Sequence, residues 1–205
     1  GSDTLIDGAG NDRAYGDEGS DLVVAGAGND QYDGGDGIDV LSFASAGAGV
    51  DVDMDKGRAS GSATGNDRFD SFEAVVGSEF DDEIAGSDAG DEIDGAGGDD
   101  LISGGEGADI LTGGAGADVF VWDDRDLDDG VVDTITDFDA AMDVLDFSAL
   151  DYQGKGGPSD GERVVLTETD GGTLVSVDMD RAPGETDVVF LDGVTGLSGT
   201  DWFTF

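Results

Sequence analysis

One aspartate recurs every nine residues through two long runs of this chain, and this period constrains the fold more than any other feature. The first run is Asp3, Asp12, Asp21, Asp30 and Asp39, and the second is Asp82, Asp91, Asp100, Asp109 and Asp118. A short fixed period is typical of a solenoid, because each unit buries its apolar residues only against neighbouring units. We therefore expect stacked coils rather than a globular core.

Each unit combines a glycine-rich turn with one apolar position. Glycines stand two or four residues before most of the aspartates, where they permit close backbone approach: Gly8, Gly10, Gly19, Gly26, Gly28, Gly35, Gly37, Gly98, Gly105, Gly107, Gly114 and Gly116. A mostly apolar residue stands two residues after each aspartate: Leu5, Ala14, Val23, Tyr32, Leu41, Ile84, Ile93, Ile102, Leu111 and Phe120. The pattern predicts a six-residue turn followed by a three-residue strand whose middle side chain points inward. Two units then complete a coil of 18 residues, so equivalent turns stack at i and i+18.

This stacking brings aspartates of neighbouring coils together. The expected pairs are Asp3–Asp21, Asp21–Asp39, Asp12–Asp30, Asp82–Asp100, Asp100–Asp118 and Asp91–Asp109. Strands of neighbouring coils lie ~4.8 Å apart, so the paired carboxylates repel each other unless a cation lies between them. Carboxylates and turn carbonyls together supply the roughly 6–8 oxygen ligands that Ca²⁺ prefers, whereas Mg²⁺ requires a smaller octahedron. We therefore predict that the ten aspartates and the turn glycines bind several Ca²⁺ ions.

The alternative is that these aspartates only form turns, as Asp commonly does. Turn formation alone does not require Asp at one fixed position in ten units, which favours metal ligation. The choice stays open for Asp82 and Asp91, because their turns carry Phe80 and Ala89 at the usual glycine position.

The composition narrows the classes of function. Asp and Glu total 50 and Lys and Arg total 8, so the formal net charge is −42, which argues against nucleic acid or an anionic membrane as partner and for cations. The absence of Cys and His removes disulfides, His-based triads and His-containing zinc sites, so we expect no catalytic residues and no enzyme activity. No apolar run approaches the ~18 residues of a membrane span. Regularly spaced apolar residues, 37% of the chain, disfavour an acidic disordered tail.

The unit resembles the nonapeptide of the RTX (repeats-in-toxin) family, G-G-x-G-x-D-x-U-x with U a large apolar residue. The clearest copies span residues 34–41, 104–111 and 113–120. The resemblance implies an all-β fold, a right-handed parallel β-roll (β-solenoid) of nonapeptide repeats with a C-terminal β cap. It also implies the C-terminal region of a larger protein secreted to the extracellular space by a type I pathway of a Gram-negative bacterium. The implied partners are calcium ions, the secretion machinery and an N-terminal domain of the parent protein.

The repeats divide the chain into four parts. We expect a first repeat block at 1–42, an enlarged-loop β coil at 43–76, a second block at 77–122 and a capping and secretion-signal region at 123–205. The linking coil breaks the phase, because 43 residues separate Asp39 from Asp82. Alternation over residues 50–54 predicts one strand there, and the apolar residues between 69 and 76 predict another.

The last part resembles segments that close RTX rolls. Its acidic residues either hold another ion or form a solvated turn: Asp133, Asp137, Asp139 and Asp143. Residues 164–167 and 174–177 predict a hairpin across Asp170-Gly171-Gly172, and residues 188–191 predict a third strand. The ending, residues 201–205, resembles an uncleaved type I secretion signal, with a simple β cap as the alternative.

One outward face of the first block is apolar, with Ile6, Leu22 and Val24 on one sheet. We expect the C-terminal region or a neighbouring domain to cover it.

These observations predict a calcium-binding module that folds on meeting extracellular Ca²⁺ and so supports secretion of a larger protein. The alternative is a calcium-dependent polysaccharide-binding accessory module of an extracellular carbohydrate-active enzyme. An anionic polysaccharide would need a cluster of basic residues. Those of this chain are few and look scattered along the sequence: Arg13, Lys56, Arg58, Arg68, Arg125, Lys155, Arg163 and Arg181.

Overall fold

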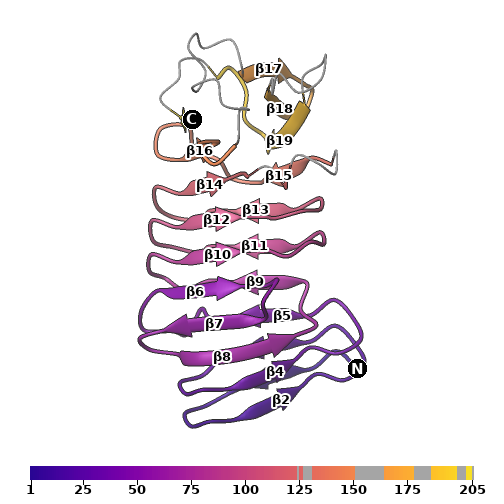
Figure 1. The fold of residues 1–205 in the computed structure, drawn as a ribbon, viewed down its shortest axis with the longest axis vertical. Coiled ribbons are helices and arrows are strands. Elements are labelled where there is room, and N and C mark those ends of the chain that lie inside the picture. Colours follow the sequence, from indigo (N-terminus) through magenta and orange to yellow (C-terminus); the bar gives the residue numbers. More distant parts are fainter. Residues whose placement is uncertain (124, 127–130, 151–163, 178–185, 198–201, 205) are drawn as a thin grey trace.

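Two ten-stranded sheets face each other and form one elongated β-roll in the computed structural model (Figure 1). The structure describes residues 1–123, 125–126, 131–150, 164–177, 186–197 and 202–204. No helix among them is long and apolar enough to span a membrane.

The chain alternates between the two sheets. The first sheet, in spatial order, contains β1 (Thr4–Ile6), β3 (Leu22–Val24), β5 (Val40–Ser42), β9 (Ala74–Val76), β11 (Glu92–Asp94), β13 (Ile110–Thr112), β15 (Asp133–Ile135), β19 (Thr186–Asp192), β18 (Gly172–Val177) and β17 (Val164–Glu168). The second contains β2 (Arg13–Tyr15), β4 (Gln31–Asp33), β8 (Gly65–Asp70), β7 (Arg58–Gly61), β6 (Val50–Asp53), β10 (Glu83–Ala85), β12 (Leu101–Ser103), β14 (Val119–Val121), β16 (Val144–Asp146) and β20 (Phe203–Thr204).

The strands of the repeat blocks stack in parallel at the predicted register. Leu5 lies opposite Val23, and Val23 lies opposite Leu41, each pair 18 residues apart. The second block has the same register, with Ile84 opposite Ile102. This arrangement confirms the all-β parallel β-roll and its 18-residue coil.

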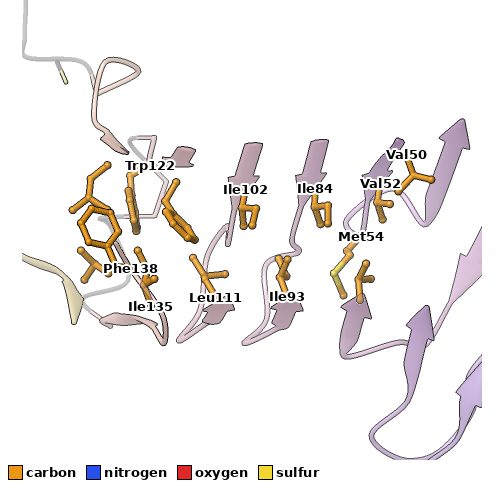
Figure 2. Packing of buried hydrophobic residues seen from close by; sticks show 14 of the residues in the cluster. Val50, Val52, Met54, Ile84, Ile93, Ile102, Leu111, Trp122, Ile135 and Phe138 are labelled. Carbon is orange, nitrogen blue, oxygen red and sulfur yellow. The ribbon is translucent and has the colours of Figure 1, made fainter. Parts of the chain in front are cut away.

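The core consists of two facing rows of side chains, one row from each sheet (Figure 2). Ile84 and Ile102 point inward from the second sheet, and Ile93 and Leu111 point inward from the first (Figure 2). All four are at most 1% exposed, as expected for the middle residue of each three-residue strand. Each strand contributes one inward side chain because successive side chains of a strand point to opposite faces.

The link between the two blocks differs from the expected coil. Residues 69–76 are not one strand: Phe69 belongs to β8 in the second sheet, and Val75 and Val76 belong to β9 in the first. Strands β6, β7 and β8 form an antiparallel meander between β4 and β10. The strand β7 was not predicted, because its sequence Arg-Ala-Ser-Gly has only one apolar residue besides glycine.

The meander makes the two sheets unequal. From β1 to β15 the first sheet has seven strands, whereas from β2 to β16 the second has nine. At ~4.8 Å per strand, the two extra strands lengthen one side of the roll by roughly 10 Å. The coils of the first block consequently tilt relative to those of the second (Figure 1). Large side chains fill the widened interior: Tyr32, Met54, Phe69 and Phe72.

The C-terminal end closes the roll with aromatic residues and a predicted hairpin. The strands β17, β18 and β19 pair in antiparallel order and extend the first sheet, which confirms the hairpin and the third strand. Trp122 packs on Phe147 and Trp202 packs on Phe138, with ring centroids 5.4 and 6.4 Å apart. Of the ending proposed as a secretion signal, residues 201 and 205 lie outside the described residues.

The described C-terminal strands do not cover the apolar outer face, and its cover by a neighbouring domain stays a prediction. Those strands extend the roll at its far end from β1 (Figure 1), and Ile6 remains 78% exposed. They extend the first sheet edge to edge because β19 pairs with β15, which places them in line with the sheet rather than on its face.

Candidate metal sites

Carboxylates form two ladders, one along each sheet. Each turn contributes one carboxylate at its end. The first ladder follows the first sheet: Asp3, Asp21, Asp39, Glu73, Asp91, Asp109 and Asp133. The second ladder follows the second sheet and is interrupted by β7 and β6: Asp12, Asp30, Asp67, then Asp82, Asp100, Asp118 and Asp143.

Backbone amides fix the orientation of these carboxylates. The N–H of Asp21 donates to Oδ1 of Asp39 at 2.7 Å, and the N–H of Asp82 donates to Oδ1 of Asp100 at 2.8 Å. The same bond recurs along both ladders, over 18 residues within the repeat blocks and over 24 to 37 residues where the chain inserts extra residues between coils. In most ladder steps, one carboxylate oxygen is therefore held by a backbone N–H of the preceding coil.

The second oxygen of several ladder carboxylates has no partner. Oδ2 is buried without a hydrogen bond in Asp21, Asp39, Asp100 and Asp109, all of which are at most 2% exposed. A buried ionised carboxylate without a cation is costly, because burial removes its hydration. Among the described residues, the only ion pairs are Lys56–Asp53 and Arg125–Asp123, so no basic side chain neutralises these four groups.

The turns also present main-chain oxygens at close range. Gly105 has φ +90°, and a Cβ there would collide with the carbonyl oxygen of Ser87 in the neighbouring turn. In the described part of the chain, the carbonyls of Gly10, Gly19 and Gly98 accept no backbone hydrogen bond from a stacked turn. The donor set is thus entirely oxygen, which fits the hard cation Ca²⁺ better than Zn²⁺ or copper.

Asp82 and Asp91 differ from the four unpartnered carboxylates, because serines of their own turns hydrogen-bond to them. The hydroxyl of Ser78 donates to Oδ1 of Asp82 at 2.8 Å, and the Ser78 N–H donates to its Oδ2 at 2.5 Å. The Ser87 N–H and hydroxyl donate to Oδ2 of Asp91 at 2.6 and 2.9 Å. These two turns therefore supply protein partners for the charge that other turns leave unpartnered.

The remaining predicted ligands of the first block lie in more varied settings. Asp3 and Asp12 are exposed near the first coil, and their N–H groups donate to Asp21 and Asp30. Asp30 is buried, and its Oδ2 accepts the Tyr32 hydroxyl at 3.1 Å. The predicted turn glycines all lie in the turns that carry the ladders.

Of the four acidic residues predicted to hold a C-terminal ion, Asp137 and Asp139 lie near Asp143, where their charges add to the effect of burial in raising its pKa, whereas Asp133 belongs to the other ladder. Asp133 ends the first ladder, where its Oδ2 accepts the Trp122 Nε1–H at 2.7 Å, and Asp143 ends the second. Asp137 accepts N–H groups from Gly113 and Gly114. Asp139 lies beside Asp143, since its N–H donates to Oδ2 of Asp143 at 2.7 Å.

Two ladder members were missed by the sequence analysis. Asp67 accepts the Asp30 N–H at 2.9 Å, and Glu73 accepts the Asp39 N–H at 2.8 Å. A repeated Gly-Asn-Asp triplet, at residues 10–12, 28–30 and 65–67, could have indicated Asp67. Glu73 offers no comparable signal, because the residue type differs and the spacing is broken.

Burial and mutual repulsion disfavour the charged forms of the ladder carboxylates. Burial raises the pKa of Asp100 to about 7. The hydrogen bond from the Asp82 N–H lowers this pKa in part, whereas the negative charges of Asp82 and Asp118 raise it further. Burial likewise raises the pKa of Asp109, with Asp133 and Asp91 adding to it. Both shifts reflect negative charge that the protein itself does not compensate.

Known proteins share the repeat. A family model described as RTX calcium-binding nonapeptide repeat matches in four copies, over residues 1–32, 73–102 and 85–120. No curated protein sequence matches the chain. Among solved structures, the chain is similar to the extracellular lipase LipA from Serratia marcescens, at 17% identity and a TM-score of 0.35, over 100% of this chain and 38% of the lipase chain. It is also similar to the AlgE6R3 subunit from the Azotobacter vinelandii mannuronan C5-epimerase, at 28% identity and a TM-score of 0.26, over 62% and 79% of the two chains.

The raised pKa values predict a pH dependence of the calcium-free protein. The folded pKa of Asp100 lies near 7 against an ordinary 3.8, so between these values the fold binds more protons than the unfolded chain. The stability of the calcium-free fold should therefore fall as pH rises from about 4 to 7. We expect the β signal in circular dichroism of desalted protein to be larger at pH 5.5 than at pH 8, and less pH-dependent in Asp100→Asn. A β signal that decreases on acidification would contradict this.

Proposed function

This chain carries RTX calcium-binding nonapeptide repeats, and we propose that it is a module that folds when it meets extracellular Ca²⁺ and thereby supports type I secretion of a larger protein. Such repeats are typical of secreted proteins and are calcium-binding rather than catalytic units. We propose as ligands the turn carbonyls and the ladder carboxylates other than Asp82 and Asp91, with Asp21, Asp39, Asp100 and Asp109 as the main ones.

The observation that carries the proposal is the unpartnered Oδ2 of these four buried aspartates. Bound Ca²⁺ would supply the positive charge that the turns lack. Without it, the stacked carboxylates repel one another and oppose the approach of neighbouring coils. The glycine-rich turns add to the cost, because glycine loses more conformational freedom on folding than any other residue.

The free energy of calcium binding is large enough to determine whether the chain folds. Extracellular calcium modules typically have Kd values of ~10⁻⁴–10⁻³ M. A site with ligand at tenfold excess over its Kd contributes about 1.4 kcal/mol. Four sites, one for each of Asp21, Asp39, Asp100 and Asp109, would contribute roughly 6 kcal/mol, comparable to the ~5–15 kcal/mol stability of a whole domain. Binding and folding then become one event.

This coupling suits export. In a calcium-poor cytosol the chain remains expanded, which a narrow secretion channel requires, and outside the cell it folds and holds the exported segment there. We propose the secretion machinery and an N-terminal domain of the parent protein as the further partners. The chain spans 38% of the length of the lipase to which it is similar. The activity of the parent protein therefore does not follow from this chain.

A calcium titration followed by circular dichroism tests the proposal. We expect a cooperative rise of β signal at submillimolar to millimolar Ca²⁺ and little change with Mg²⁺ at the same concentrations, because Mg²⁺ dehydrates reluctantly and needs a smaller octahedron. A full β signal that is already present in chelator and does not change when Ca²⁺ is added would contradict the proposal.

A matched pair of variants sharpens this titration. Asp109 and Asp91 occupy neighbouring positions of the first ladder, but only Asp109 has an unpartnered Oδ2. We expect Asp109→Asn to bind at least one Ca²⁺ fewer per chain at saturation in equilibrium dialysis. The control Asp91→Asn should bind as many ions as the unmodified chain, because Ser87 already satisfies the Asp91 carboxylate.

One observation favours a second function, binding of an acidic polysaccharide. The basic residues are not scattered as their sequence positions suggest: Arg13, Gln31, Arg68 and Arg58 form one row across β2, β4, β8 and β7. Stacking and the meander bring them together. All three arginines are exposed, and among the described residues no carboxylate lies within 4.0 Å of them. Arg58 and Arg68 are cross-strand neighbours, and their mutual repulsion is compensated only in part by Asp53, which lies opposite Arg58 on β6.

Retention on an immobilised polyuronate tests this second function. With calcium present, we expect the double variant Arg58→Gln, Arg68→Gln to bind at least tenfold more weakly than the unmodified chain. Arg125→Gln, which removes an arginine paired with Asp123 elsewhere, should bind normally. Equal retention of both variants, or equal binding to a neutral glucan, would exclude the arginine row as a glycan site.

A further inference from the structure

The meander contains a turn that copies a repeat turn, although it stands outside the nine-residue period. We infer that the turn at residues 62–67 and the stacked turn at residues 25–30 together form an additional Ca²⁺ site, with Asp67 and Thr64 as ligands. This inference rests on the proposed calcium-dependent folding and assigns a site to the segment between the two repeat blocks, which the repeat family does not match.

Backbone hydrogen bonds show that the two turns stack as repeat turns do. The Gly28 N–H donates to the Thr64 carbonyl at 2.8 Å, as the Gly10 N–H donates to the Ala27 carbonyl at 2.8 Å. The turns thus continue a stack that begins at residues 7–12, even though Asp67 follows Asp30 by 37 residues instead of 18.

The Gly-Asn-Asp triplets reproduce the side-chain bonds as well. The Asn66 N–H donates to Oδ1 of Asn29 at 2.9 Å, as the Asn29 N–H donates to Asn11 at 3.1 Å. The Asp30 N–H donates to Oδ1 of Asp67 at 2.9 Å, as the Asp12 N–H donates to Asp30 at 2.8 Å. Asp67 therefore has the orientation of a ladder carboxylate of the repeats.

Close approach of the two turns requires a glycine in the meander turn. Gly65 has φ +97°, and a Cβ there would collide with the Gly28 carbonyl oxygen. Gly28 and Gly65 form an isolated parallel bridge, so this carbonyl oxygen faces the meander turn and keeps a second lone pair for a ligand. A main-chain oxygen is therefore available beside the Asp67 turn.

Two buried polar atoms of this turn have no partner. Asp67 is 3% exposed and its Oδ2 accepts no hydrogen bond, and Thr64 is 2% exposed and its hydroxyl makes none. A buried carboxylate oxygen and a buried hydroxyl are rarely left unsatisfied in proteins. Both would be satisfied by one hard cation, since carboxylate, hydroxyl and carbonyl oxygens are all acceptable ligands of Ca²⁺.

Acidic neighbours make a cation the suitable occupant. Oxygens of Asp7, Asp12 and Asp30 lie within 4.8 Å of one another, and the Tyr32 hydroxyl contacts Asp7 at 2.7 Å. No Lys or Arg nitrogen in the described part of the chain lies within 4.0 Å of these carboxylates. A cavity of about 280 Å³ is lined by Asp7, Gly26 and Thr64, so of these carboxylates Asp7 borders open space beside the meander turn. The charge and the unpartnered oxygens therefore point to the same ligand.

The site would fix the meander to the first block. The strand β8 pairs with β4 on one side and with β7 on the other, so an ion between the turns at 25–30 and 62–67 clamps the end of β8 to the coil beneath it. The bend of the roll lies at this point. Calcium would then set the angle between the two blocks as well as the stacking within each.

The test compares Asp67→Asn with Asp51→Asn in the full chain. Asparagine retains Oδ1 as acceptor for the Asp30 N–H, so the stacked geometry is preserved, and Asp51 is an exposed residue of the same meander. At saturating Ca²⁺ we expect Asp67→Asn to bind one ion fewer per chain in equilibrium dialysis, while Asp51→Asn binds as many ions as the unmodified chain.

Hydrogen exchange locates the effect. In Asp67→Asn with calcium, amides of β7 and β8 should exchange at least tenfold faster, whereas amides of β10 to β13 should be unchanged. Thr64→Val, which retains the shape and removes the hydroxyl, should accelerate exchange in the same strands. Unchanged stoichiometry and unchanged exchange in Asp67→Asn would overturn the additional site and leave the proposed function intact, whereas an unmodified chain that binds no calcium would overturn the proposed function itself.

Discussion

Stacking of aspartates between successive coils is the interaction on which the rest of the structure depends. In each ladder the backbone N–H of one coil holds Oδ1 of the next, as between Asp21 and Asp39, and this bond directs Oδ2 into the turn. The same geometry that makes the coils regular therefore concentrates negative charge where no basic side chain reaches it. The roll has a net charge of −42 and a thin core, to which each strand of the repeats contributes one inward side chain. Its negative charge therefore needs cations from outside the chain.

The turns solve this problem in two ways. Where glycine occupies the turn, as at Asp109, one carboxylate oxygen stays unpartnered and carbonyl oxygens lie close by. Where serine follows the first glycine, as at Asp91, hydroxyl and N–H groups satisfy the carboxylate. The Asp82 turn stacks directly on the meander, because the Val50 N–H donates to Oδ1 of Asp82, whereas the Asp91 turn lies on the other sheet next to the Glu73 turn. The turn that adjoins the irregular part of the roll thus depends little on an added cation.

The repeat made most of the fold predictable, because position in the nine-residue unit determines burial. Ile93 and Ile102 were assigned to the core from spacing alone and are fully buried. The meander could not be predicted in the same way, because the strand at residues 58–61 has no alternating apolar pattern and pairs through its backbone. Asp67 escaped notice because the meander inserts 19 residues into an 18-residue spacing, and the arginine row appears only after Arg13, Arg68 and Arg58 are brought onto adjacent strands.

Long-wavelength diffraction from crystals grown with Ca²⁺ would test most directly whether cations compensate the unpartnered ladder oxygens. We expect anomalous difference peaks between stacked turns, about 2.3–2.6 Å from Oδ2 of Asp21, Asp39, Asp100 and Asp109, with carbonyl oxygens completing each shell. A fully ordered roll with no anomalous peak beside those four oxygens would contradict the account.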